Sequence, residues 1–357
     1  MDGIRFLAVT LVLADHWSGD RLGFPASYLG VCMFFVLSGF LITRILLSAK
    51  EKDLGLKRGH GFSLKQFYIR RTIRIFPLYY LTLAVLFILN VPPVRDKIVW
   101  LATYMTNNYF AIHETWFGSV DHLWSLAVEE QFYLFFPFVI LFLPLKRISK
   151  ALLFLVIFAV ALRTYFFFDG SSWIKPYVLM PTCLDAFGIG GLLAYWVYFK
   201  KDKALQMLSK PLSPILGTLL YFLTVYWLKQ IGGGHNYVAI IFLRLAESLL
   251  SLSILGFLVA SGRNSFKSFF ELNPVVYIGK ISYGIYIFHN FLYNEYHKIS
   301  WSPIVKLIDK MSSSQNVLIS SLTTRIVVLY LLVIALASIS WYLFEKPINK
   351  LKNRYGY

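Results

Sequence analysis

Ten apolar segments, separated by more polar stretches, run through almost the whole sequence. Each is long enough, in some cases with tilt or partial burial, to cross about 30 Å of hydrocarbon as a helix. We expect these spans at residues 3–18, 28–48, 72–91, 122–145, 151–168, 176–199, 211–228, 236–261, 275–293 and 321–344.

Composition agrees with a bilayer environment. Only 15% of the residues are charged, against ~25% in a soluble domain. The chain is therefore predicted to be an all-α, polytopic integral membrane protein with about ten transmembrane helices. We expect a single membrane-embedded domain over residues 1–357, with no appended soluble domain.

The basic residues predict the orientation, because Lys and Arg are enriched in short cytoplasmic loops. With a cytoplasmic N-terminus, inside segments hold 22 of the 35 Lys and Arg, outside segments hold 8, and five lie within spans. We therefore expect both termini to be cytoplasmic and the loops 92–121 and 294–320 to be outside. Nucleic-acid binding is not expected, because the basic residues are spread over several loops rather than gathered in one domain.

Two carboxylates interrupt the fourth apolar segment. Glu129 and Glu130 lie in its first half, and a charge at membrane depth costs at least ~2.5–3.5 kcal/mol, so such residues face a protein interior or a watered cavity. At ~100° per residue, His122, Ser125 and Glu129 share one helix face. The pattern indicates an intramembrane polar seam, and it leaves open which of the two glutamates faces inward.

The first span carries Arg5 and His16, eleven residues apart. Eleven steps bring the two side chains to one face, about 16 Å apart along the axis. A snorkelling arginine and a structural histidine are the alternative. Other polar residues also fall within spans, and we expect Arg244 and Glu247, at i and i+3, to form a structural ion pair. The remainder are Arg163, Asp185, His289, Arg325 and, near the last exit, Glu345.

Three arginines lie at the predicted cytoplasmic entry to the third span. Arg71 and Arg74 are three residues apart on one face, and Arg70 flanks them. Guanidinium groups bind phosphate oxygens in bidentate fashion, so the cluster is suited to an anionic ligand. The alternative is that it anchors the helix to anionic lipid.

Cys32 and Cys183 both lie in apolar segments. They provide no disulfide framework and no metal-ligand spacing, and we interpret them as small core residues. No metal and no permanently bound cofactor is expected.

Several of these stretches resemble motifs of the acyltransferase-3 family of integral membrane O-acyltransferases, in the expected order and over nearly the whole chain. One departure is Cys183, where many members place an arginine. The matching stretches are residues 1–16 with the Arg5 to His16 spacing, 34–42, 70–77, 124–133, 282–289 and 344–347.

The resemblance implies transfer of an acyl group, often acetyl, from cytoplasmic acyl-CoA to a hydroxyl of a cell-envelope carbohydrate or glycolipid. It implies a multi-pass protein of the bacterial cytoplasmic membrane, with other envelope-biosynthesis proteins as potential partners. His16 is suited to act as the base or as an acyl carrier.

The remaining roles follow from the same resemblance. Arg5 would polarise a carbonyl, neutralise donor phosphates or orient His16. Arg71 and Arg74, flanked by Arg70, would hold the phosphates of coenzyme A. Glu129 or Glu130 would fix the tautomer of His16 or place the acceptor. The polar residues left for a substrate-binding or structural role are His122, Ser125, Asp185 and His289.

Two other functions fit ten spans with buried charges. A solute or proton-coupled transporter would use an Asp/Glu/His relay, but the sequence has no detectable inverted repeat and no paired Gly- or Pro-broken spans. A non-catalytic scaffold in an envelope-polymer complex is the third reading, and the intact Arg5 and His16 pair disfavours it.

Overall fold

A computed structural model of the protein describes residues 1–200, 202–298 and 302–356. Within these residues the chain is helical and contains no β-strand, which confirms the all-α prediction. Lys201, one of the 22 basic residues of the predicted inside segments, and residues 299–301 of the loop 294–320 lie outside the described residues.

The long helices of the bundle are α1 (Asp2–Ser18), α2 (Ala26–Gly55), α3 (Gly61–Ile88), α6 (Leu123–Phe142), α7 (Leu145–Phe168), α9 (Leu184–Tyr198), α11 (Leu212–Gln230), α12 (Arg244–Ala260) and α18 (Leu322–Ser340). The shorter helices are α4 (Ile98–Ala102), α5 (Thr106–His113), α8 (Ile174–Val178), α10 (Asp202–Leu208), α13 (Ser265–Phe270), α14 (Asn273–Lys280), α15 (Ser282–Leu292), α16 (Pro303–Ser312), α17 (Val317–Ser320) and α19 (Lys346–Lys350). Short 3₁₀ turns form η1 (Gly19–Leu22), η2 (Met180–Cys183) and η5 (Leu351–Arg354), and π-helical turns form η3 (Val238–Leu243) and η4 (Trp341–Glu345).

Helices occupy all ten predicted apolar ranges. Two of these helices fall short of a full span: α1 has 17 residues, and the predicted span 275–293 is divided into α14 and α15 at Ile281. The count of ten therefore stays a prediction. In the described part of the chain, eight helical segments are long and apolar enough to cross a membrane, namely Ala26–Gly55, Gly61–Ile88, Leu123–Phe142, Leu145–Phe168, Met180–Tyr198, Leu212–Gln230, Val238–Ala260 and Leu322–Arg354.

α2 is the central helix of the bundle. In its most apolar stretch 72% of the residues are buried, against 22% in α7 and α11. α2 packs against α1, α6, α9 and α12, and it approaches α9 closely because Gly39 and Gly190 lack side chains. A Cβ at Gly39 would lie 2.1 Å from the carbonyl oxygen of Phe187, and one at Gly190 would lie 1.9 Å from that of Val36. Small residues at such contacts allow intramembrane helices to pack backbone to backbone.

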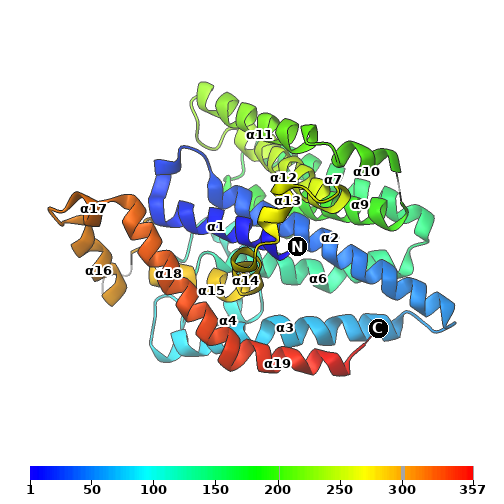
Figure 1. Ribbon diagram of the computed structural model, residues 1–357, viewed down its shortest axis with the longest axis horizontal. Coiled ribbons are helices and arrows are strands. Elements are labelled where there is room, and N and C mark those ends of the chain that lie inside the picture. Colours follow the sequence, from blue (N-terminus) through cyan, green and yellow to red (C-terminus); the bar gives the residue numbers. More distant parts are fainter. Residues whose placement is uncertain (201, 299–301, 357) are drawn as a thin grey trace.

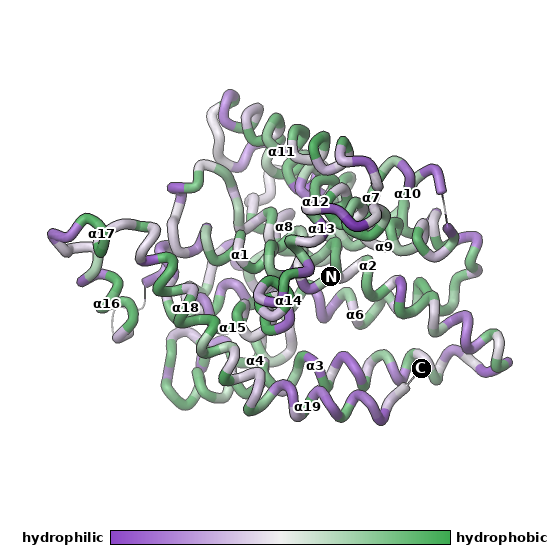
Figure 2. The backbone as a smooth tube through the Cα atoms, viewed as in Figure 1, coloured by the Kyte–Doolittle hydropathy of each residue, from purple (hydrophilic) through white to green (hydrophobic). Residues whose placement is uncertain are grey.

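The outer helices surround this centre. Figure 1 shows α11 and α12 along one margin, α3 and α19 along the other, and α1, α2 and α6 between them. In Figure 2 the residues of α11 are predominantly hydrophobic, whereas hydrophilic residues gather around α19 and the adjoining end of α3. The exposed apolar side chains of α7 and α11 indicate the surface that faces lipid.

The predicted topology can be tested by cysteine accessibility. Cysteine at Thr115 and Ser313, both exposed, should react with a membrane-impermeant maleimide from the outside, whereas cysteine at exposed Gln206 should react only after the inner face is opened. The native Cys32 and Cys183 are buried, so the background should be low. Labelling of Gln206→Cys in intact cells would contradict the arrangement.

Candidate active site

A cleft of about 530 Å³ opens where α1, α2 and α3 meet the C-terminal segment. Among the described residues, its lining contains seven basic side chains and no acidic one. We call it the arginine cleft. The basic residues are Arg5 from α1, Arg44 and Lys52 from α2, Arg70, Arg71 and Arg74 from α3, and Lys352 from η5.

Most of these basic side chains form no ion pair within the protein. In the part of the chain that the structure describes, Arg44, Lys52, Arg71 and Arg74 form no ion pair. Arg5 does, because its Nη1 lies 2.5 Å from Asp2 Oδ1. A recess lined by one sign of charge concentrates ligands of the opposite sign, so the cleft is suited to a polyanion.

Arg70 has a further role in shaping the cleft. Its guanidinium donates to the carbonyl oxygens of Lys352, at 3.0 Å, and Tyr355, at 2.6 Å. These contacts fix the C-terminal segment against α3 and so place Lys352 on the cleft wall.

A second, smaller cavity of about 100 Å³ adjoins the arginine cleft, and Arg5, Leu41, Arg71 and Arg74 line both. Glu129 and Glu130 both line this second cavity, which we call the carboxylate cavity. The sequence left open which of the two faces inward, and in the structure both do. Glu129 Oε1 accepts a hydrogen bond from Ser38 Oγ at 2.5 Å. Glu130 Oε1 is buried and has no hydrogen-bond partner in the described chain.

Aromatic hydroxyls complete the carboxylate cavity. The hydroxyl of Tyr133 lies 3.1 Å from Ser38 Oγ, and the guanidinium of Arg71 lies 5.3 Å from the Tyr133 ring centre. Ser125 Oγ lies 2.6 Å from the hydroxyl of Tyr286. Ser282 and Tyr283, the first residues of α15, line the cavity directly after the break at Ile281. Ile281 is buried in protein, as expected for non-helical backbone at membrane depth.

Three histidines form a cluster beside the carboxylate cavity. His16 Nδ1 lies 2.9 Å from His289 Nε2, and the His122 and His289 ring centres are 5.0 Å apart. His122 precedes Ser125 by three residues and His289 follows Tyr286 by three, so the cluster lies about one helical turn beyond the end of the cavity. The predicted seam of His122, Ser125 and Glu129 therefore leads from the cavity to the cluster, with His122 as the residue that precedes α6.

The hydrogen bonds of the cluster define the tautomer of His16. His289 Nδ1 lies 2.6 Å from the carbonyl oxygen of Tyr286, and a carbonyl oxygen only accepts, so His289 carries its proton on Nδ1. In the neutral ring Nε2 is then an acceptor, and His16 Nδ1 must donate to it. This leaves the lone pair of His16 Nε2 available to act as a base or nucleophile.

Arg5 and His16 therefore lie at opposite ends of α1, in different parts of the site. Arg5 pairs with Asp2 and lines the cleft, whereas the side chain of His16 contacts His289. Neither Arg5 nor the two glutamates orients His16 in this structure. About three helical turns separate Arg5 from His16, Glu129 accepts from Ser38, and the hydrogen-bond partner of His16 is His289.

Loops hold the end of α1 that carries His16. The amide of Glu295 donates to the His16 carbonyl oxygen at 2.8 Å. Nearby, His297 Nε2 lies 3.0 Å from Asp121 Oδ2, and this hydrogen bond raises the pKa of His297. Loops 92–121 and 294–320 are therefore joined next to the histidine cluster.

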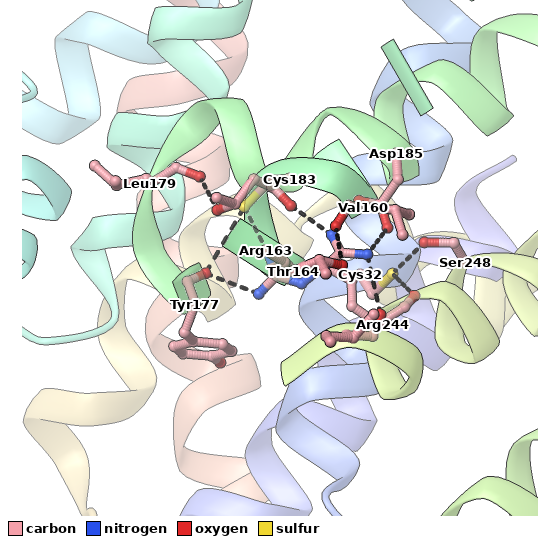
Figure 3. A network of polar contacts seen from close by, with 12 residues as sticks. Cys32, Val160, Arg163, Thr164, Tyr177, Leu179, Cys183, Asp185, Arg244 and Ser248 are labelled. Atoms are coloured by element: carbon pink, nitrogen blue, oxygen red, sulfur yellow. Dashed lines mark hydrogen bonds and ion pairs between the residues drawn. The ribbon is translucent and has the colours of Figure 1, made fainter. Parts of the chain in front are cut away.

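Asp185 lies apart from the seam, in the buried network of Figure 3. Its Oδ2 pairs with Arg163 Nη2 at 2.7 Å. The expected ion pair between Arg244 and Glu247 is wrong, since Arg244 instead donates to Cys183 Sγ at 2.5 Å and to the Tyr177 carbonyl oxygen at 2.8 Å. Both cysteines are buried and free, as expected of core residues.

The sequence reasoning missed several cavity residues. Ser38, Tyr133 and Tyr286 lay within stretches already recognised as motifs, and Tyr133 follows Glu129 by one helical turn, which is a usable signal. Lys352 carried no signal, because nothing in the local pattern shows that the C-terminal segment returns to α3.

The fold and site together define a polytopic helical membrane protein in which the arginine cleft adjoins an intramembrane site of carboxylates and histidines. The acyltransferase-3 family profile, described as an acyltransferase domain, matches residues 1–345. The chain belongs to this family of acyltransferases, and the comparison favours the enzyme over the transporter and scaffold readings.

Two bacterial relatives illustrate the similarity. The chain is 31% identical over 315 residues to a peptidoglycan O-acetyltransferase, OatA, of Listeria monocytogenes, covering 81% of this chain and 48% of the relative. It is 28% identical over 377 residues to the O-acetyltransferase OatA of Staphylococcus aureus, covering 98% of this chain and 57% of the relative. The chain thus spans about half the length of these curated relatives. No solved structure matches it.

Proposed function

We propose that the protein is an O-acetyltransferase of the bacterial cytoplasmic membrane, which moves acetyl from cytoplasmic acyl-CoA to a hydroxyl of a cell-envelope glycan such as peptidoglycan. The observation that carries the proposal is the continuity of the arginine cleft with the carboxylate cavity through Arg5, Arg71 and Arg74. The name of the Listeria relative supports the acetyl group and the acceptor class.

The donor would enter from the arginine cleft. Coenzyme A carries several phosphate charges at one end and an uncharged pantetheine arm at the other. The phosphates fit the guanidinium groups of Arg71 and Arg74, which form no ion pair in the described chain. The arm fits the narrower carboxylate cavity, where the unpartnered Glu130 Oε1 would accept a hydrogen bond from a pantetheine amide.

His16 would act as the general base. Its Nε2 takes the proton of the acceptor hydroxyl while the hydroxyl oxygen bonds to the thioester carbonyl carbon. The carbon–sulfur bond then breaks, and the sulfur leaves as a thiol with the proton that His16 returns. Ser125 and Tyr286 lie at the histidine end of the cavity, where both hydroxyls donate to the His122 carbonyl oxygen. A hydroxyl that exchanges this acceptor for the developing oxyanion would stabilise it.

Mass spectrometry of envelope glycans tests the proposal. Muropeptides and other glycans from cells with the gene should carry an O-acetyl mass increment that is lost on deletion and restored by the wild-type gene. An unchanged set of O-acyl groups after deletion would sink the proposed function. If the lost mass increment corresponds to another acyl group, that group is the one transferred, instead of acetyl.

A further inference from the structure

A third cavity, of about 40 Å³, lies at the other end of the bundle from the arginine cleft. We call it the aromatic pocket. Its lining includes Tyr28, Trp173, Tyr177, His235, Arg244 and Glu247. The mechanism proposed above uses none of these residues.

The three cavities follow one another along α2. Tyr28 lines the aromatic pocket, Phe35 and Ser38 line the carboxylate cavity, and Arg44 and Lys52 line the arginine cleft. The rise of a helix places Tyr28 about 24 Å from Arg44 along the axis. A ligand in the aromatic pocket therefore approaches from the end opposite to the polyanion.

The aromatic pocket lies at the level of His16. Ser27, next to Tyr28, donates a hydrogen bond to Asp15, next to His16. Trp124 lies between a lining residue of each cavity, because its ring contacts Tyr177 of the aromatic pocket, with centres 4.9 Å apart, and Phe35 of the carboxylate cavity, at 6.2 Å. A single buried side chain thus links the linings of the two cavities.

Planar rings form the sides of the pocket. Trp173 and His235 stack with ring centres 3.7 Å apart and planes 5° apart, and Tyr28 lies against Tyr177 at 4.5 Å. His235 follows three glycines with φ of 93°, 64° and 71°, a left-handed path that other residues adopt at a cost. The three glycines therefore allow the turn that places the His235 ring against Trp173.

The charged side chains that line the pocket are Arg163, Arg244 and Glu247. The two η nitrogens of each arginine bond to protein acceptors, among them Asp185, which is not part of the lining (Figure 3), whereas Arg163 Nε has no hydrogen-bond partner among the described residues. Glu247 is 2% exposed, and its Oε1 has no hydrogen-bond partner among the described residues. A buried carboxylate oxygen without a donor is costly, and a donor from a ligand would satisfy it.

A local irregularity of the backbone supports a binding role. The residues Val238–Leu243 form a π-helical turn directly before α12, and Ala239, Ile240 and Leu243 line the pocket. Such turns occur frequently at functional sites.

We propose that the aromatic pocket binds an uncharged sugar ring of the acceptor glycan. Ligand sites of this kind combine aromatic walls with a few convergent polar groups. The C–H face of a pyranose packs on a planar ring, and a sugar hydroxyl donates to Glu247 Oε1. Glu247 and the existing ion pair of Arg163 with Asp185 disfavour a phosphate or carboxylate ligand, in contrast to the arginine cleft. The inference rests on the proposed function for the identity of the ligand as an acceptor.

The test is binding of chitotetraose, an uncharged oligomer of N-acetylglucosamine, to the purified full chain in detergent, measured by isothermal titration calorimetry. Trp173→Ala and Glu247→Gln should each weaken binding about tenfold or more, and Trp173→Phe should recover part of the affinity. Trp227→Ala, a tryptophan outside the pocket on α11, should bind as the wild type does. Acetyl-CoA binding should be unchanged in all four variants, which also shows that they fold.

Wild-type affinity in Trp173→Ala, absence of chitotetraose binding to the wild type, or tighter binding of glucuronate than of chitotetraose would each overturn the inference. Failure of the proposed function is a separate result. If chitotetraose binding follows the pattern above while deletion of the gene leaves the O-acyl groups unchanged, the sugar site stands and the transferase assignment falls.

Discussion

Replacing His16 with glutamine should lower acetyl transfer by a factor of about 10²–10⁴, the usual contribution of a positioned acid–base group. Acetyl-CoA binding should stay close to the wild-type value, because the arginine cleft lies at the other end of α1. Glutamine keeps a hydrogen-bonding side chain toward His289, so it preserves a structural role and removes proton transfer. The measurement is acetyl transfer from radiolabelled acetyl-CoA to glycan by the purified protein, with donor binding in parallel.

The histidine cluster provides the matched control. His289→Ala removes the acceptor that orients His16 Nδ1 but leaves the base itself, so it should reduce transfer less than His16→Gln does. Near-normal transfer by His16→Gln would remove His16 from the chemistry and make Glu130, with its unpartnered oxygen, the leading candidate. A stable acetyl-histidine in quenched enzyme would instead make His16 an acyl carrier.

The positions of the helices could be predicted well because the bilayer imposes a length on every span. The predicted segment 28–48 lies within α2, and 151–168 lies within α7. The ends were less predictable. The fourth span ends at Phe142 rather than 145, because Pro144 precedes the next helix, and the break at Ile281 has no Gly or Pro at that position to signal it.

Periodicity along one helix also predicted part of the site. It grouped Arg71 with Arg74, and Ser125 with Glu129, and the structure places all four on the carboxylate cavity. It says nothing about which helices meet. His16 and His289 are 273 residues apart in sequence, so their contact is a property of the packing of α1 against α15.

The predicted ion pair of Arg244 and Glu247, which the structure does not contain, shows the same limit of helical periodicity. Arg244 and Glu247 have the spacing of an ion pair within a helix, and yet Arg244 bonds to Cys183 and Tyr177. In a buried setting a guanidinium satisfies several acceptors at once, and the acceptors that other helices bring near it decide the outcome. Helical spacing alone therefore does not predict a pair where other helices supply competing acceptors.

The second large effect is expected at the arginine cleft. Arg71→Ala combined with Arg74→Ala should weaken acetyl-CoA binding by roughly 3 kcal/mol or more, which is over about 100-fold in Kd, since each charge-assisted contact contributes about 1.5–3 kcal/mol. Lysine at both positions should restore part of the affinity, because the charge returns without the forked geometry. Calorimetric titration of the purified protein with acetyl-CoA measures both.

The alternative that these arginines only anchor α3 to anionic lipid is tested by a variant with the same loss of charge elsewhere. Lys146→Ala combined with Arg147→Ala removes two exposed cations from another predicted cytoplasmic loop, and it should bind acetyl-CoA normally. Raising the salt concentration should weaken donor binding in the wild type and less so in the double cleft variant, because fewer charges remain to be screened. If the cleft variant folds and binds acetyl-CoA as the loop variant does, the cluster is a membrane anchor and the donor site lies elsewhere.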